Sequence, residues 1–421
     1  MRSFHKLSRS ALALASPAIM GLLPAAAHAG EVTLPINVYG FLNAEVETVK
    51  ADGGTTPYAS RGRVTDGNSR LGINGSFVVN DELKAIWQLE GSLNNFDQGG
   101  VNDQGQSETL TSRNSYIGLD DKRYGRFLVG NYDSAYRSLI GSGGEMGGNL
   151  GLSTLGLDLW NNTSAQVTGN ANSTFSRGEA RYKNSVHYFS PELYGVQVAA
   201  SYGFDETQSD GLNRGRFALA VKYRLGGLQL GVGVDQQKQT GVNVNQEQLG
   251  YGLQQTGEAG NKTTYAKFVA SYLFPTHTYL GFGIEQARYG FTLFTPPSSG
   301  NIYGVTAVGS MKQTGAMISI AQEIGPNLTV MLSGGTLGNL NNAQVGNGKD
   351  YEASQTSFGA KYRINKMLTT YAYVTRIRNK AQQSVNLGQD PLYSVGNGTT
   401  SAYLSPGDSP QALGVGLIAS F

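Results

Sequence analysis

The sequence predicts an all-β fold, a sixteen-stranded antiparallel β-barrel that crosses a membrane. Three observations favour this fold over a soluble β-sandwich with one wet face. Apolar and polar residues alternate along most of the chain, short and long connections alternate, and the last predicted strand ends in Phe421. Many predicted strands are also longer than the roughly 5–6 residues usual in soluble sheets.

Residues 1–29 have the pattern of an export signal. A basic start that ends at Arg9 precedes an apolar stretch over 11–23, and Ala27-His28-Ala29 is a small-x-small cleavage site. A membrane anchor is the alternative, but Pro17 and Pro24 interrupt the stretch, which is too short to span a bilayer. We therefore expect residues 30–421 to form the mature barrel domain.

The composition disfavours several other classes of protein. The chain has 32 basic and 30 acidic residues; the predicted signal holds three of the basic ones, which leaves 29 against 30 and a net charge near −1. That balance gives no support for nucleic-acid binding. Cysteine is absent, so disulfides and thiolate metal sites are not available. After the signal no uncharged apolar run approaches the roughly 20 residues of a membrane-spanning helix.

Catalytic and cofactor motifs are not found in the sequence. The two histidines of the mature chain, His187 and His277, fall in different predicted strands. No Gly-x-Ser-x-Gly nucleophile elbow occurs. The glycine-rich stretch 141–148 lacks the Gly-Lys-Ser/Thr that follows a phosphate-binding loop. We expect no metal, no cofactor and no enzymatic activity.

One face of each predicted strand is apolar and the other is polar, often cationic. Along 216–225, Phe217, Leu219 and Val221 share one face, and Arg216 and Lys222 lie on the other. The same period of two residues runs through 70–77, 84–93 and 358–364. Such strands suit a barrel with an apolar outside and a wet inside.

The connections set the number of strands. Seven are short: Asn80-Asp81, Asp120–Gly125, Pro191–Gly195, Gly226-Gly227, Pro275–His277, Gly325–Asn327 and Asn365-Lys366. Eight are long and polar: 50–67, 96–108, 133–175, 205–212, 241–260, 290–309, 339–349 and 380–410. The short ones join strands 2 to 15 in pairs, and a first and a last strand close the ring. This gives sixteen strands, with short periplasmic turns and long extracellular loops.

The membrane favours a closed sheet for a physical reason. In hydrocarbon every backbone N–H and C=O must be paired within the protein, so a sheet can span only if it closes. Aromatic residues near many strand ends fit the membrane interface, although ordinary β-propensity would also place them there. They include Tyr39, Tyr116, Tyr188, Tyr202, Tyr223, Phe274, Tyr362 and Tyr371.

The last strand gives the sharpest local signal. Leu413, Val415, Leu417, Ala419 and Phe421 share one face of it. A terminal aromatic residue on the lipid-facing side of the strand is the pattern expected of a substrate of the outer-membrane assembly machinery. The sequence therefore predicts the bacterial outer membrane as the location.

Six segments carry a resemblance to a known family. They are INVYG at 36–40, SRLGI at 69–73, LKAIWQLE at 83–90, RNSYIGL at 113–119, NSVHYFSP at 184–191 and the terminal GLIASF. With them the chain resembles the Gram-negative general porins, nearest their β-proteobacterial, Neisseria-type branch. The likeness covers most of the mature chain; it is specific in the first half and follows mainly the rhythm of strands over 205–400.

The resemblance implies a function and an assembly. General porins form water-filled channels for passive diffusion of small hydrophilic solutes and ions, embedded in outer-membrane lipids. Three such barrels form a homotrimer, and in each the third loop folds into the pore as a constriction. A barrel of sixteen strands is wide enough to leave an aqueous channel.

The third long loop fits a role inside the barrel. Residues 133–175 form the longest loop, which is rich in glycine and unusually apolar, with five leucines and Trp160 between 150 and 160. Folding against the inner wall would shield these side chains. A surface cap at the trimer rim is the alternative.

The resemblance also implies residues for the constriction. The family's ladder of basic residues on the pore wall carries over to Arg70 and Arg113, with Arg181 as third member and Arg177 as its competitor. Acidic counterparts would be Glu90 on the wall and Glu145 and Asp158 on the loop. For each arginine, an ordinary salt bridge on the wall is the alternative.

Two departures from the family pattern affect the expected selectivity. Gly130-Asn131 stands where the family often has Gly-Arg, which removes one cation. The run Glu145-Met146-Gly147-Gly148-Asn149 keeps the first acid of the family's loop motif and loses the second. We therefore expect a constriction less acidic than usual, with weak anion preference or low selectivity.

Three other functions remain open from the sequence. A substrate-specific channel for sugars or organic anions would need an aromatic slide, to which Tyr132, Tyr136 and Trp160 could contribute. A barrel lipase would need a Ser-His-Asp/Glu set, but neither histidine has an evident partner. A structural or adhesive barrel would not conduct ions.

Overall fold

The computed structural model describes residues 36–65, 69–93, 110–140, 174–209, 211–242, 255–295, 304–344, 346–387, 391–392 and 404–421. The strands are β1 (Ile36–Asp52), β2 (Tyr58–Thr65), β3 (Arg70–Val78), β4 (Leu83–Leu93), β5 (Leu110–Ser112), β6 (Ser115–Asp121), β7 (Gly125–Asp133), β8 (Arg181–Phe189), β9 (Val196–Gly203), β10 (Gln208–Ser209), β11 (Leu212–Asn213), β12 (Arg216–Leu225), β13 (Leu228–Val242), β14 (Gln255–Leu273), β15 (Thr278–Thr295), β16 (Gly304–Ile324), β17 (Leu328–Leu337), β18 (Ala353–Arg363), β19 (Leu368–Asn379) and β20 (Ser409–Ser420). Two short 3-10 helices, η1 (Arg137–Leu139) and η2 (Gly348–Tyr351), follow β7 and β17.

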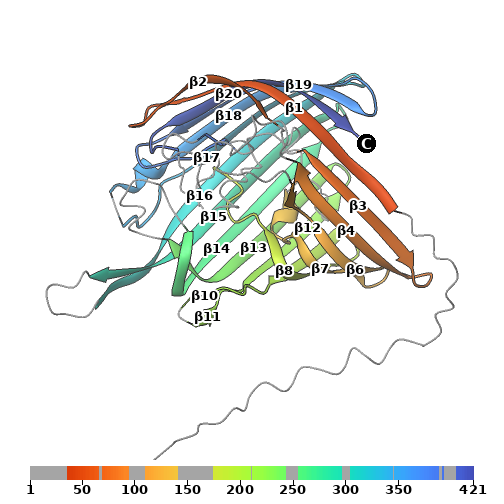
Figure 1. Ribbon diagram of the computed structural model, residues 1–421, viewed down its shortest axis with the longest axis horizontal. Coiled ribbons are helices and arrows are strands. Elements are labelled where there is room, and N and C mark those ends of the chain that lie inside the picture. Colours follow the sequence, from red (N-terminus) through yellow and green to blue (C-terminus); the bar gives the residue numbers. More distant parts are fainter. Residues whose placement is uncertain are drawn as a thin grey trace, which may run out of the picture. The chain divides into compact units, whose positions relative to one another are not determined.

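Eighteen of these strands form one antiparallel sheet that closes on itself (Figure 1). β2 and β3 both pair with β1, and β5 and β6 both pair with β4, so each of these couples is one interrupted barrel strand. The barrel therefore has sixteen strands, as predicted. β10 and β11 form a separate small hairpin.

The ring closes between the first and the last strand. β1 pairs with β20 from Phe41↔Ser420 to Asp52↔Ser409. Beyond this register the amide of Gly40 donates to the carbonyl of Phe421 at 3.0 Å, and the amide of Phe421 donates back to Gly40 at 3.1 Å. Closure leaves no unpaired sheet edge along this seam, which is what a spanning sheet requires.

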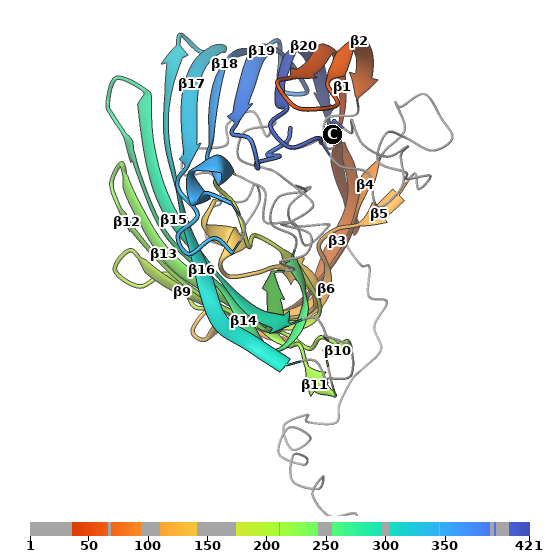
Figure 2. The same ribbon diagram turned by 90° about the vertical axis from the view of Figure 1, so that its left-hand side faces the viewer.

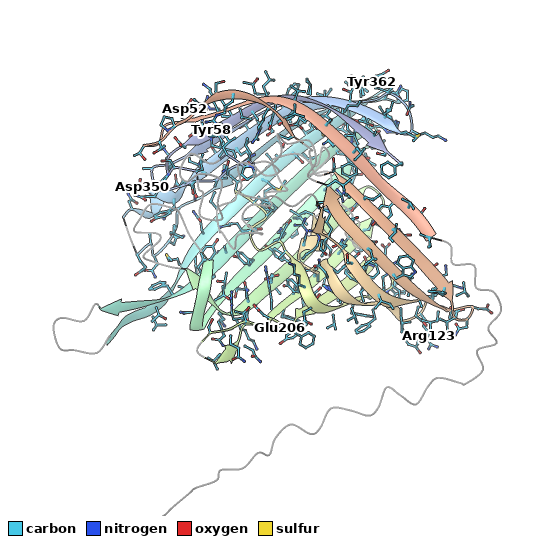
Figure 3. All side chains as sticks on the ribbon, in the orientation of Figure 1. Asp52, Tyr58, Arg123, Glu206, Asp350 and Tyr362 are labelled. Atoms are coloured by element: carbon cyan, nitrogen blue, oxygen red, sulfur yellow. The ribbon has the colours of Figure 1, made fainter. Side chains whose placement is uncertain are left out.

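All seven predicted short connections fall where two neighbouring strands of the barrel meet, so their positions are confirmed. The connection predicted over Asp120–Gly125 is shorter, because β6 runs to Asp121 and β7 begins at Gly125. Three of them use the same device, in which a side-chain oxygen accepts two backbone amides. Asn80 Oδ1 accepts from residues 82 and 83, Asp121 Oδ1 from 123 and 124, and Asn365 Oδ1 from 367 and 368. Arg123 and Tyr362 mark this end of the barrel in Figure 3, and Asp52 and Asp350 mark the opposite end.

Three long loops are shorter than predicted. Pairing continues to Val242↔Gln255 between β13 and β14, to Thr295↔Gly304 between β15 and β16, and to Ala51↔Tyr58 between β1 and β2. The predicted loop 290–309 contains Phe291, Thr292 and Val305 near its ends, and these aromatic and β-branched residue types favour strands. The polar residues between them concealed this pattern.

The outer face of the barrel is apolar, as predicted. On β20 the exposed fractions are 62% for Leu413, 56% for Val415 and 46% for Leu417, and Phe421 directly after the strand is 51% exposed. Similar rows of exposed apolar residues occur on β12, β15 and β18. Soluble monomers rarely expose apolar patches of this extent. None of the described helices is long and apolar enough to cross a membrane.

Two apolar clusters lie on the inner side of the wall. One surrounds η1 and includes Tyr136, Leu139 and Phe175. The other joins Val385, Leu387 and Leu404, from the connection after β19, to inward residues of β1, β2 and β17–β20. Figure 2 shows β3, β4 and β6 across the barrel from β12, β13 and β15. Segments of the third loop and of the connection after β19 therefore cover parts of the inner wall.

Candidate functional site

The described ends of the third loop, 134–140 and 174–180, lie inside the barrel, as predicted. Tyr136 is fully buried, and its hydroxyl donates to Glu285 Oε2 of β15 at 3.1 Å. Leu139 packs against Gly231 and Gly233 of β13 so closely that added Cβ atoms would lie 2.9 and 2.7 Å from its methyl groups. A cap outside the barrel is therefore wrong for these segments.

A buried charge cluster holds the returning end of the loop. Arg177 Nε lies 3.0 Å from Glu285 Oε1, and neither side chain is exposed. Lys267 Nζ lies 3.4 Å from Glu285 Oε2 and also pairs with Glu179. Burial raises the pKa of the Glu179 carboxyl to about 7, although the charge of Lys267 acts in the opposite direction. Arg177 thus anchors the loop and does not face the channel.

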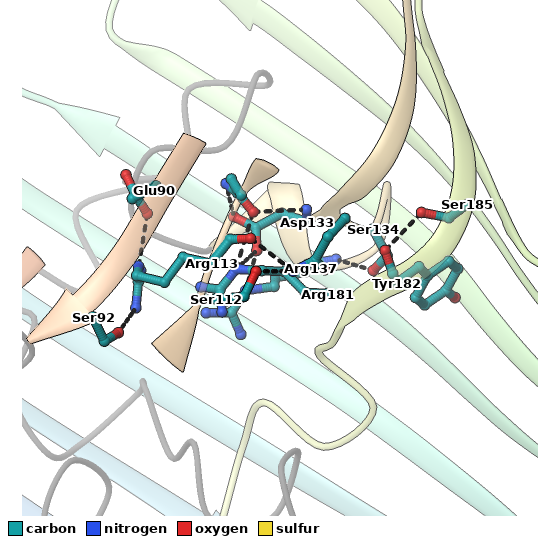
Figure 4. Close-up of polar contacts among 12 residues, drawn as sticks. Glu90, Ser92, Ser112, Arg113, Asp133, Ser134, Arg137, Arg181, Tyr182 and Ser185 are labelled. Atoms are coloured by element: carbon teal, nitrogen blue, oxygen red, sulfur yellow. Dashed lines mark hydrogen bonds and ion pairs between the residues drawn. The ribbon is translucent and has the colours of Figure 1, made fainter. Parts of the chain in front are cut away.

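Glu90 and Arg113 form the first part of a polar cluster on the other wall (Figure 4). Arg113 Nε donates to Glu90 Oε1 at 2.7 Å, and its terminal nitrogen donates to Ser92 Oγ at 3.2 Å. The hydroxyl of Tyr39 donates to Glu90 Oε2 at 3.0 Å. Glu90 therefore faces inward on β4, as its position in the strand pattern predicted.

Asp133, at the end of β7, is the second carboxylate of this cluster. It lies 2.8 Å from Arg137 Nε and 3.1 Å from Arg181 Nε. Asn114 donates to Asp133 at 3.2 Å and accepts from Arg181 at 3.0 Å. The sequence reasoning missed Asp133, Arg137 and Asn114. The four-residue spacing of Asp133 and Arg137 was a usable signal, because a helical turn brings such side chains together.

Arg70 completes the group. Its guanidinium lies over the ring of Phe41, 4.6 Å from the centroid, and it is close enough to Arg113, Glu90 and Asp133 to interact with their charges. Its Nε has no hydrogen-bond partner among the described residues. Arg70, Arg113 and Arg181 are thus brought together, while Arg177 lies in the separate buried cluster.

Exposure distinguishes the arginines of the group. The side chain of Arg181 is 21% exposed, against 8% for Arg113 and 5% for Arg137. Among the described residues of this group, four arginines lie beside two carboxylates, which gives an excess of two positive charges (4 − 2 = +2). Glu145 and Asp158 lie outside the described residues.

Asn131 occupies the position of the cation that the family pattern would supply on β7. Its amide nitrogen donates to the carbonyl of Arg113 at 2.7 Å and to Ser112 Oγ at 3.3 Å. It therefore supports the backbone that presents Arg113 but adds no charge.

The aromatic and histidine candidates lie elsewhere. Tyr132 and Tyr136 are buried, and Tyr132 packs edge-to-face on Tyr116 and Phe189, so they do not form an exposed aromatic slide. His187 lies between Ser185 and Ser201 at 2.8 Å from each hydroxyl, whereas His277 is exposed in the turn after β14. In the described ranges no three metal-ligating side chains gather.

The internal loop segments are linked to one another. Gln313 of β16 accepts from Arg177 through its carbonyl at 3.1 Å and donates through its side chain to the carbonyl of Tyr351 at 2.9 Å. Gln383, after β19, donates to the same carbonyl at 2.7 Å. Three loops that lie far apart in sequence are therefore joined along one side of the wall.

Comparisons with known proteins agree with this architecture. A family model described as Gram-negative porin matches residues 11–382. An outer membrane porin protein of Bordetella pertussis is 24% identical over 395 residues, covering 86% of this chain and 93% of that protein. The major outer membrane protein P.IB of Neisseria lactamica is 29% identical over 212 residues, covering 49% of this chain and 54% of that protein.

Solved structures show the same fold. The anion-selective porin from Comamonas acidovorans has a TM-score of 0.65 at 19% identity, covering 92% of this chain and all of that chain. OmpT of Vibrio cholerae has a TM-score of 0.59 at 14% identity, covering 92% and 97%. With a family model matched over most of its length, the chain belongs to the Gram-negative porin family and is a non-enzymatic outer-membrane channel for passive diffusion.

Proposed function

We propose that Arg70, Arg113 and Arg181, with Arg137, form the basic wall of the constriction and give the channel a weak preference for anions. The observation that carries this proposal is that Arg113, Arg137 and Arg181 pair with Glu90 and Asp133, with Arg70 beside them. Counted over the described residues, positive charges exceed negative charges by two on this wall. Anions gain favourable interactions there, and cations of the same size are repelled.

Arg181 and Arg70 are the members expected to meet solutes. Arg181 is more exposed than Arg113 and Arg137, and Arg70 is half-buried, with its guanidinium stacked on Phe41. Arg113 and Arg137 are largely buried by their carboxylate partners. Their role is to set the local charge and to hold Glu90 and Asp133 in place.

The loop acids Glu145 and Asp158 complete the proposal as counter-charges across the gap. Positive charge on one wall and negative charge on the loop create a transverse field that orients polar solutes. Asn149 stands where the family has a second acid, so the loop contributes less negative charge to this field than the family pattern would. The anion-selective porin of Comamonas acidovorans shares this fold.

The decisive experiment measures the reversal potential of single channels in a KCl gradient across a planar bilayer. Chloride should permeate better than potassium, and Arg70→Gln and Arg181→Gln should each lower the chloride-to-potassium permeability ratio. Lys366→Gln, in a turn at the far rim, should leave the ratio unchanged. Strong potassium preference in the unmodified protein contradicts the proposal.

The same recordings test the substrate-specific alternative. Passive diffusion predicts that conductance rises in proportion to salt concentration and that added sugars block it only by their size. Saturation of conductance by a sugar or an organic anion, with competitive block, would instead favour a specific channel. The burial of Tyr132 and Tyr136 supports the general channel.

We also propose that residues 1–29 are an export signal and that three barrels form a homotrimer. The signal proposal is supported by the charge and cleavage pattern at the start of the chain. The trimer is supported by the family assignment. Mass spectrometry of the mature N-terminus and of the intact complex in detergent measures both.

A further inference from the structure

A row of four cations crosses the outer face of the barrel. Lys238 of β13, Lys262 of β14, Arg288 of β15 and Lys312 of β16 are all exposed. Each shares the outward side of its strand with the lipid-facing apolar residues, because each is an even number of positions from one of them. Val232, Phe268, Ile284 and Ile318 are these exposed neighbours, at 48%, 37%, 41% and 57%.

The cations oppose one another directly across the sheet. Lys238 is in register with Lys262, and Arg288 is in register with Lys312. Arg288 is also opposite Thr264, two residues from Lys262, so the two pairs are diagonal neighbours. Side chains directly opposite lie about 5 Å apart at Cβ, and like charges in that position destabilise a sheet. Two such pairs side by side need a source of negative charge.

The residues that the structure describes do not supply that charge. In the described part of the chain none of the four forms an ion pair. Arg288 makes a hydrogen bond to a neutral side chain: its Nε donates to Ser310 Oγ at 3.0 Å. The cations therefore keep charge available for an external anion.

The position of the row identifies the kind of anion. Between the cations and the apolar belt lies a band of uncharged polar side chains: Gln236, Thr264, Gln286 and Thr314. The four cations lie on the long-loop side of this band, which is the extracellular side of such a barrel. They thus stand where hydrocarbon gives way to headgroups, a position in which basic residues attract anionic lipids.

We infer that Lys238, Lys262, Arg288 and Lys312 form a binding site for the phosphate groups of outer-leaflet lipid. Four strands place the outer members of the row roughly 14 Å apart. That span is wider than one phosphate, so a headgroup that carries more than one phosphate fits the row best. Lipid bound here neutralises both like-charge pairs and continues the apolar contact below them through its acyl chains.

The test uses the purified protein folded in detergent and titrated with bis-phosphorylated lipid A. Binding is read by native mass spectrometry, and dephosphorylated lipid A is the matched ligand. Lys238→Gln/Lys262→Gln and Arg288→Gln/Lys312→Gln should each weaken binding about 25-fold, from about 5-fold for each basic residue near the surface. Lys122→Gln/Lys366→Gln removes two exposed cations from turns at the opposite rim and should bind like the unmodified protein.

Two further measurements separate lipid binding from loss of folding. The charge-preserving variant Arg288→Lys/Lys312→Arg should retain binding. Without lipid, Arg288→Gln/Lys312→Gln should unfold at an equal or higher temperature than the unmodified protein, because a repulsive pair has been removed. Phosphorylated lipid should then raise the unfolding temperature of the unmodified protein more than that of the variant.

Several results would overturn the inference. Equal binding of phosphorylated and dephosphorylated lipid A would show that acyl chains alone make the contact. Equal loss in the Lys122→Gln/Lys366→Gln control would show that total charge, and not the row, matters. A change in the number of barrels per complex, with lipid binding unaltered, would assign the row to contacts between copies of the chain.

Discussion

Arg177 and Glu285 form an ion pair from which solvent is wholly excluded, and this pair joins the end of the third loop to β15. The backbone amide of Arg177 also donates to the same carboxylate oxygen at 3.0 Å. The end of the loop is therefore fixed to β15 by an ion pair, and Phe175 adds apolar packing.

Replacing Arg177 with Met should destabilise the folded protein by about 3–5 kcal/mol, because Glu285 would lose a partner in a buried site. Channel noise in planar bilayers should increase at the same time, since the loop loses its anchor. Arg126→Met, which removes a pair with Asp120 at partly exposed positions, should cost no more than about 1 kcal/mol. If both variants lost the same free energy of unfolding, burial of the Arg177–Glu285 pair would not add to its contribution.

The stability of the loop anchor should fall as pH rises from about 4.5 to about 7. The pKa of Glu179 is raised in the folded protein, so the folded state holds its proton after the unfolded chain has released it. The unfolding midpoint should therefore be lower at pH 8 than at pH 5. Glu179→Gln should reduce this pH difference, and an unchanged pH profile in that variant would assign the effect to another group.

Asp408 should hold the connection between β19 and β20 against the inner wall. Its side chain is buried, and Oδ1 accepts from the amide of Gly54 at 2.8 Å. In Asp408→Ala this segment should be cut faster by an added protease, while the barrel remains resistant to it. Glu206→Ala, at an exposed position, is the control and should be cut at the original rate.

Gly416→Ala should destabilise the seam of the barrel. A Cβ at Gly416 would lie 2.2 Å from Cζ of Tyr371, whose hydroxyl donates to Glu45 Oε2 at 2.6 Å. Forcing the ring away costs about 1–3 kcal/mol of overpacking, measured as a lower guanidinium midpoint. At Gly62 an added Cβ meets no atom within 4 Å, so Gly62→Ala should be nearly neutral.

The fold could be predicted because its determinants are local and repeated. Alternation with a period of two and a turn after every second strand specify which face is wet and how many strands there are. Asn80, Asp121 and Asn365 could be recognised as turn residues from their type alone. The exact ends of β13–β16 could not be predicted, because strand pairing continues into segments whose polar composition is typical of loops.

The candidate site was only partly predictable, since it depends on contacts between distant strands. Arg70, Arg113, Arg181 and Glu90 followed from strand position and from the family resemblance. Asp133 and Arg137 were missed, because the cluster forms where β7 turns into the loop. Arg177 was a candidate for the wall from its place near β8, but its partner Glu285 lies 108 residues away, beyond what sequence spacing can reveal.

The hydrogen bonds between Gly40 and Phe421 have a consequence for biogenesis. They join the first barrel strand to the last. An incomplete ring would expose two strand edges with unpaired backbone N–H and C=O groups to hydrocarbon, where each unpaired group costs several kcal/mol. A ring with fewer strands is therefore unfavourable in the bilayer, and insertion of the strands should be coupled to closure of the ring.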